Sequence, residues 1–120
     1  MKLESKFYNE LNRITPKIRW TRLENTSVLG TPDLLGYNIH QHFFTVELKV
    51  TKTNKVRLSP HQISFHILHP ENAFILVKTK TACRLYLGKQ VRELFACGLS
   101  LEPVACGWMD TRLWLESLGQ

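Results

Sequence analysis

Three charged residues interrupt two apolar strands in the segment GTPDLLGYNIHQHFFTVELKV, which covers residues 30–50. The rest of the segment has the pattern of a β-hairpin, because an apolar run, a polar turn and a second apolar run follow one another. The charges belong to Asp33, Glu47 and Lys49. A charge inside an apolar strand destabilises the folded state unless another group pairs with it. The hairpin is therefore expected to hold a polar site.

The spacing of the two acids predicts where that site lies. Strand side chains alternate between faces, so Phe44 and Val46 share an apolar face while Glu47 and Lys49 share the other. If the hairpin folds about His40, Asp33 and Glu47 lie opposite each other, with Cβ atoms about 4.5–5.5 Å apart. Two carboxylates at this distance repel each other, and a hard divalent cation such as Mg²⁺ or Mn²⁺ between them would remove the conflict.

An ordinary salt bridge is the alternative explanation, in which Glu47 and Lys49 pair on a solvent-exposed strand face. Pro32 favours the metal site instead, because proline cannot donate a hydrogen bond to a sheet and is found at strand starts and edges. This position places Asp33 at the rim of the sheet, where a ligand can reach it.

The remaining sequence predicts helices and strands in the order α-β-β-β-α-β-β-α, with a further short helix expected from Asp110. Ser59, Pro60 and Gln62 form a capping-box sequence that marks the start of the second helix. The chain of 120 residues is expected to be one domain. The fold class is α/β or α+β, with a central mixed sheet of about five strands flanked by helices. Strands are predicted at residues 17–24, 33–37, 43–50, 73–79 and 83–88, and the main helices at residues 3–14, 58–70 and 89–98.

The charge balance favours a polyanionic partner such as nucleic acid. The chain has 16 Lys and Arg residues against 10 Asp and Glu, and its cations are concentrated in residues 2–22 and 49–57. Two solvated basic faces without a ligand are the alternative. No apolar run approaches the ~18–20 residues that span a bilayer, and the N-terminus lacks a signal-peptide core. The three cysteines form no CxxC pair, which favours a reducing compartment such as the cytoplasm.

At Pro32, Asp33, Glu47 and Lys49 the sequence resembles the signature of the PD-(D/E)XK nuclease superfamily. The order of elements up to residue 78 resembles that superfamily's restriction-endonuclease-like core. The segments GTPD and LSPHQ resemble the GxPD and LSPxQ segments of VRR-NUC-type nucleases and archaeal-type Holliday junction resolvases. Residues after about 88 match no motif of the superfamily. The resemblance implies that residues 1–120 form a single PD-(D/E)XK nuclease-like domain.

The resemblance also implies a metal-dependent phosphodiesterase that acts on DNA. Asp33, Glu47 and the main-chain carbonyl of Leu48 would hold Mg²⁺, which would polarise the scissile phosphate and lower the pKa of a bound water. Lys49 would orient that water or stabilise charge on the phosphate. Gln62 would lie near the site; the capping box with Ser59 explains the same residue, and both roles are compatible.

Many members of the superfamily add an acid from the first helix, where Glu4 and Glu10 are the candidates. Glu4 is favoured, because it lies three and seven residues before Phe7 and Leu11 and so shares their inward face. Glu10 lies off that face. The residues expected to contact DNA are basic and come from the first helix and the loop after the catalytic strand: Lys6, Arg13, Lys52, Lys55 and Arg57.

Together with the charge pattern, the resemblance implies a small Mg²⁺-dependent DNA endonuclease that is selective for DNA structure, such as a junction resolvase or a VRR-NUC nuclease. A homodimer is expected, because cutting both strands of a symmetric junction takes two sites. The alternatives are a restriction-type, repair-type or RNA-directed nuclease, a non-catalytic DNA-binding subunit and a basic RNA-binding domain. A zinc site is disfavoured because no histidine pair has HExxH spacing, and His61 is a weaker candidate for a proton carrier. No P-loop or Rossmann pattern suggests a nucleotide cofactor, and no membrane contact is expected.

Overall fold

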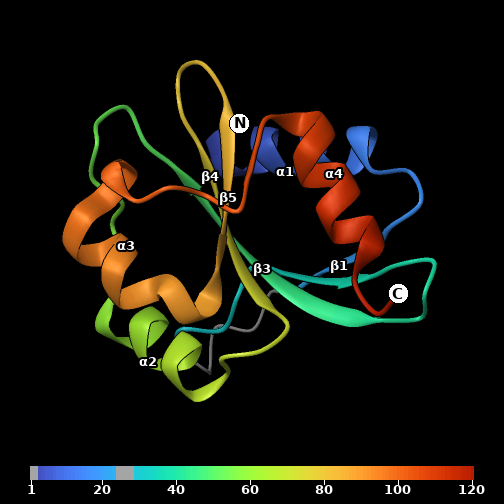
Figure 1. Ribbon diagram of the computed structural model, residues 1–120, viewed down its shortest axis with the longest axis horizontal. Coiled ribbons are helices and arrows are strands. Elements are labelled where there is room, and N and C mark those ends of the chain that lie inside the picture. Colours follow the sequence, from blue (N-terminus) through green and yellow to red (C-terminus); the bar gives the residue numbers. More distant parts are fainter. Residues whose placement is uncertain (1–2, 24–28) are drawn as a thin grey trace.

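The computed structural model describes residues 3–23 and 29–120, so the predicted strand residue Glu24 and the cation Lys2 lie outside the described part. Within that part the centre is a six-stranded sheet whose strands lie side by side in chain order (Figure 1). Only the β3–β4 pair is parallel among the described strand pairs. The sheet is therefore mixed, as predicted. Its strands are β1 (Arg19–Arg22), β2 (Leu34–Tyr37), β3 (Phe43–Val50), β4 (Ala73–Lys78), β5 (Cys83–Leu87) and β6 (Ala105–Cys106).

Helices cover both faces of the sheet (Figure 1). On one side lie α1 (Leu3–Ile14) and α4 (Trp108–Ser117), and on the other lie α2 (Pro60–Leu68) and α3 (Val91–Cys97). The predicted capping box at the start of α2 is confirmed, since Ser59 Oγ accepts from Gln62 N at 3.1 Å and Gln62 Oε1 accepts from Ser59 N at 3.0 Å. No helix in the described residues is long and apolar enough to cross a membrane.

The C-terminal part differs from the sequence prediction in two ways. The sheet has a sixth strand, β6, because the chain after α3 returns to pair with β5. This strand has only two residues, too few to show an alternating pattern. The last helix begins at Trp108 and not at Asp110, directly after Gly107, which has a φ of 88°. Positive φ is accessible to glycine without strain, so the chain can turn there from strand into helix.

Each face of the sheet packs against its own apolar core. The core on the side of α1 and α4 includes Phe7, Leu11, Val46, Leu48, Leu76 and Leu115. The core on the side of α2 and α3 includes Val56, Leu58, Ile75, Val77, Val91 and Leu94. The first core extends under β3, but the second is centred on β4 and β5. On that second face, β3 presents Glu47 next to Ile75 and Lys49 next to Val77.

The hairpin of β2 and β3 has the predicted register. Leu34 pairs with Val46 and Tyr37 pairs with Phe43, so the hairpin is centred on His40. Asn38 fixes the turn, because its side-chain oxygen accepts hydrogen bonds from the N–H groups of residues 40 and 42. Its amide nitrogen also donates to the carbonyls of residues 115 and 118, which attaches the turn to the end of α4. One step beyond the Leu34–Val46 pair, the same register places residues 33 and 47 opposite each other.

Candidate active site

Asp33 is fixed at the rim of the sheet, immediately before β2. Its Oδ2 accepts a hydrogen bond from Leu48 N at 2.7 Å, and its main-chain carbonyl accepts one from Leu23 N at 2.8 Å. These bonds continue the pairing of β1, β2 and β3 beyond the last regular residue pair. The carboxylate of Asp33 is thereby held against the backbone of β3, beside Glu47.

Gly30 explains how the chain reaches this position. It has a φ of 84°, and a Cβ atom there would lie 2.3 Å from the main-chain oxygen of His61 in the first turn of α2. Only glycine allows this close approach. The glycine of the GTPD segment thus packs against α2, three residues before Asp33, and the sequence alone gave no sign of this contact.

Glu47 is a buried acid with an unsatisfied oxygen. Its side chain is 2% exposed, and Oε1 has no hydrogen-bond partner among the described residues. Burial raises the pKa of Glu47 to about 10, assisted by a hydrogen bond with Asp33 and by the negative charges of Asp33 and Glu4, against the opposing effect of Lys49. Glu47 is therefore neutral at pH 7 in the metal-free protein. A surface salt bridge, the alternative explanation, is excluded because Glu47 is not on an exposed face.

Lys49 is held from α2. Its Nζ donates a hydrogen bond to Gln62 Oε1 at 2.9 Å, and the same oxygen accepts from Ser59 N. Gln62 therefore combines the two arrangements expected from the sequence, the helix cap and a place beside the site. The capping box fixes the glutamine, and the glutamine fixes the ammonium group next to the two acids.

The two acids of α1 lie in different surroundings. Glu4 is close enough to Glu47 for its charge to raise the pKa of that residue, and it lines a surface hollow of about 440 Å³ together with Lys49. Glu10 forms an ion pair with Lys78 of β4. Glu4 is therefore the acid of α1 that lies nearer the site. The prediction that it shares the inward face of Phe7 and Leu11 is wrong, because Glu4 is exposed and Glu10 is half-buried. A role of Glu4 as a metal ligand stays a prediction.

The cations expected to bind DNA do not all gather in one place. Lys52, Lys55 and Arg57 are exposed and line the same hollow as Glu4 and Lys49. Lys6 lines a neighbouring hollow. Arg13 lies in the last turn of α1, about 13 Å along the helix axis from Glu4. The structure therefore places the loop cations and Lys6 beside the acids, and Arg13 apart from them.

The acid pair fits a divalent metal ion, although the described residues contain no group of three or more Asp, Glu, His or Cys side chains arranged to hold one. The fit rests on the unsatisfied Oε1 of Glu47 and the adjacent carboxylate of Asp33, since hard cations take oxygen ligands. A set of two such carboxylates completed by a main-chain oxygen, here that of Leu48, has too few acids to form a group of three. Mg²⁺ commonly binds through one or two carboxylates and keeps several waters.

Among residues 3–23 and 29–120, no histidine belongs to a group of three or more His, Cys, Asp or Glu side chains that could hold a metal ion. His61 is exposed in the first turn of α2. His66 is fully buried, and neither of its ring nitrogens has a partner among the described residues. Burial lowers the pKa of His66 to about 4, with smaller contributions from His69 and Lys49. The sequence alone did not indicate that His66 would be the buried histidine among the three in and directly after α2.

Among known proteins, solved structures show a fold similar to that of this chain. No protein-family model matches the chain, and no curated protein matches it. Its fold is similar to that of a Holliday junction resolvase. One solved structure with this fold is that of Hjc from Archaeoglobus fulgidus, an archaeal hyperthermophile. Its TM-score to this chain is 0.59, and the sequence identity is 16%. The match covers 74% of this chain and 75% of Hjc. The likeness supports the expected fold class, with a sheet of six strands in place of the predicted five.

Proposed function

We propose that the protein is a divalent-metal-dependent DNA endonuclease that cuts branched DNA, such as a four-way junction. The main observation in favour is the pair of the buried Glu47 and the half-buried Asp33 beside a lysine that Gln62 holds in place. Two adjacent acids, one of them buried, lower stability unless a ligand uses them. The similarity of the fold to that of Hjc supports a nuclease of the resolvase kind.

The proposed division of roles follows from the contacts. Asp33, Glu47 and the carbonyl of Leu48 would hold Mg²⁺ or Mn²⁺ directly, and Glu4 from α1 would approach the ion through a bound water, since the described residues contain no group of three acids arranged around one ion. When bound, the ion would supply a Lewis acid for the scissile phosphate and acidify a water ligand. Lys49 would stabilise the charge that develops on the phosphate, because its ammonium group is already oriented by Gln62. Gln62 is therefore a positioning residue.

DNA would approach over the hollow that Glu4 and Lys49 line. Lys52, Lys55 and Arg57 would contact phosphates there, with Lys6 beside them, and Arg13 would reach a more distant phosphate. Phosphate contacts carry no sequence information, which agrees with recognition of DNA shape. We also propose a single nuclease-like domain that acts as a homodimer in the cytoplasm. The described cysteines are all free, as expected in a reducing compartment. The resemblance to VRR-NUC nucleases rests on the short GTPD and LSPHQ segments and stays a prediction.

A cleavage assay tests this function. Purified protein is incubated with a four-way junction, a plasmid, single-stranded DNA and RNA, each with Mg²⁺, with Mn²⁺ or with EDTA. We expect metal-dependent cuts in the junction above all. Preferential cutting of linear duplex DNA would favour a restriction- or repair-type nuclease, and RNA cleavage an RNA-directed one. DNA binding without cleavage under any condition would indicate a non-catalytic subunit, and binding of RNA alone would contradict the proposal.

A further inference from the structure

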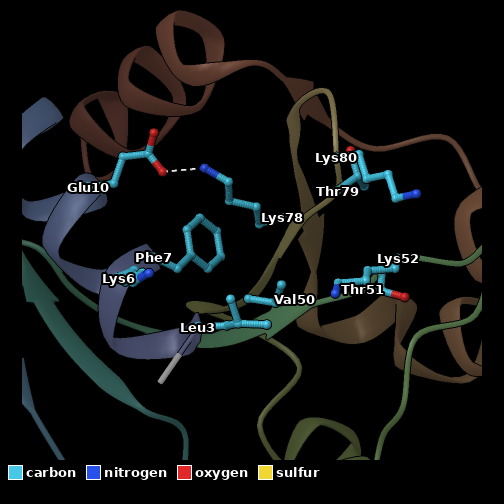
Figure 2. Close-up of a pocket in the computed structure, with 10 residues that line it drawn as sticks. All are labelled: Leu3, Lys6, Phe7, Glu10, Val50, Thr51, Lys52, Lys78, Thr79 and Lys80. Carbon is cyan, nitrogen blue, oxygen red and sulfur yellow. Dashed lines mark hydrogen bonds and ion pairs between the residues drawn. The ribbon is translucent and has the colours of Figure 1, made fainter. Parts of the chain in front are cut away.

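A second hollow, of about 310 Å³, lies at the carboxyl end of β3, and Lys49 does not line it. It is formed between α1 and the carboxyl ends of the parallel strands β3 and β4 (Figure 2). It adjoins the hollow beside the candidate site, because the two share Leu3, Val50, Thr51 and Lys52. A DNA strand that crosses the acid pair can therefore continue into the second hollow without leaving the surface.

The floor of this hollow is apolar. Figure 2 shows the ring of Phe7 at its centre, with Leu3 and Val50 on one side and Lys78 on the other. Phe7 is itself almost fully buried, whereas Leu3 is 55% exposed. The exposed apolar surface therefore comes chiefly from Leu3, with Val50 beside it. A site that bound phosphates alone would have no use for this floor.

The rim of the hollow is cationic. Lys6, Lys52 and Lys80 are exposed, and no carboxylate among the described residues forms an ion pair with them. Lys78 differs, because it is paired with Glu10 and stands over the rings of Phe7 and Trp108 at 5.9 and 6.0 Å. The Glu10–Lys78 pair closes one end of the hollow, and the other three lysines, which pair with no described carboxylate, are exposed to meet an anion.

An apolar floor with a ring of free ammonium groups matches a ligand that has a flat apolar body and a phosphate. The volume lies at the lower end of the range of small-molecule sites, about 300–1,000 Å³, and suits one nucleotide. We propose that this hollow binds one unpaired nucleotide of the DNA substrate, with its base on Leu3 and Val50 and its phosphate between Lys52 and Lys80. The inference rests on the proposed function, and it adds a reason for preferring branched DNA, whose strands leave the duplex near the cut.

The test compares two DNA ligands of equal charge. Each is a short duplex hairpin with a three-nucleotide single-stranded tail, made of thymidines in one and of abasic nucleotides in the other. Affinity is measured in EDTA by fluorescence anisotropy. Placing one base on the floor should raise the affinity for the thymidine tail about tenfold, near the lower end of the gain from stacking a base on an aromatic side chain, because Leu3 and Val50 are aliphatic.

Three variants separate the floor from the rim. Leu3→Ser and Val50→Thr should reduce the preference for the thymidine tail at least threefold while changing the affinity for the abasic tail little. Lys80→Ala should weaken the binding of both tails by similar factors. Lys89→Ala is the matched control, because Lys89 is exposed in the 3₁₀ turn of Gly88–Gln90 before α3, does not line this hollow, and should leave both affinities unchanged.

Equal affinity of the wild-type protein for the two tails would overturn the inference, as would floor variants that weaken both tails alike. The junction-cleavage assay distinguishes this failure from failure of the proposed function. Cleavage of the junction without any preference for the thymidine tail would reject the nucleotide site alone. Absence of DNA binding and of cleavage would reject both.

Discussion

The face of the sheet toward α2 and α3 carries two kinds of buried group in adjacent strands. Ile75 of β4 is fully buried in the apolar core against α3, and its neighbour across the parallel pairing is Glu47 of β3, which is 2% exposed. The same step along the strands sets Val77 beside Lys49. Sheet geometry thus fixes the Glu47–Ile75 pair and the Lys49–Val77 pair equally well. The difference is energetic, since burial of Ile75 stabilises the fold and burial of Glu47 opposes it.

This contrast indicates a division of work within one face. The half packed under α3, with Ile75, stabilises the fold. The half beside α2 holds Glu47, whose burial lowers the stability of the metal-free protein. A substitution in the first half should change stability and leave the chemistry intact. A substitution of an acid in the second half should impair the chemistry without lowering stability, and the following predictions test that division.

The largest effect is expected on cleavage. Asp33→Asn and Glu47→Gln should each lower the cleavage rate at least about 100-fold, the scale of losing a group that acts on the transition state. DNA binding should be retained. Ile75→Val is the matched control, because it trims the neighbouring core residue and should keep nearly full activity. Rates of junction cleavage at saturating Mg²⁺ are compared, and an acid variant that cuts at more than about a tenth of the wild-type rate would remove that acid from the site.

The next effect concerns stability in the packed half. Ile75→Ala should lower the free energy of unfolding by about 2–5 kcal/mol, because it leaves a cavity in a fully buried position. Urea denaturation measures this value. If the truncation costs less than about 1 kcal/mol, the core beside the site is not the main source of stability.

Glu47 should make the stability of the metal-free protein depend on pH. Its pKa is raised from 4.5 to about 10 in the folded state. The contribution of protonated Glu47 to the free energy of unfolding is therefore fully present below pH 4.5. It falls as the pH rises toward 10, with a limiting slope of about 1.4 kcal/mol per pH unit. Glu47→Gln should flatten this slope and stabilise the protein at pH 8. Melting curves from pH 7 to 9 test this, since the lowered pKa of His66 acts only below that window. An equal slope in both proteins would contradict the raised pKa.

The smallest effect is expected at Gln62, which belongs to both the helix cap and the site. Gln62→Ala should cost about 1 kcal/mol of stability through the cap, and should slow cleavage by releasing Lys49. Ser59→Ala is the control, because it removes the other half of the capping box and leaves the Lys49 contact in place. If the two variants cleave at the same rate, Gln62 serves the helix alone.

Local patterns in the sequence predicted most of the helices and strands. The period-two alternation of residues 43–50 predicted β3 with its observed bounds, and the Ser59–Gln62 signal predicted the start of α2. The hairpin register about His40 was also predictable, because turn length fixes register. These features depend on residues close together in the chain. The strand β6 was not predicted, because no local pattern indicates it: it pairs with β5 only after the chain returns from α3.

The sequence by itself determined that two acids and a lysine meet at one end of a hairpin, because the strand period and the turn length decide this locally. Only the tertiary structure decided their state. The burial that makes Glu47 neutral and the hold of Gln62 on Lys49 come from the packing of β4 and α2 against β3. The choice between Glu4 and Glu10 likewise depends on Lys78, which lies 68 residues after Glu10. Such long-range contacts set the electrostatics of the site, since a pKa depends on every group packed around it.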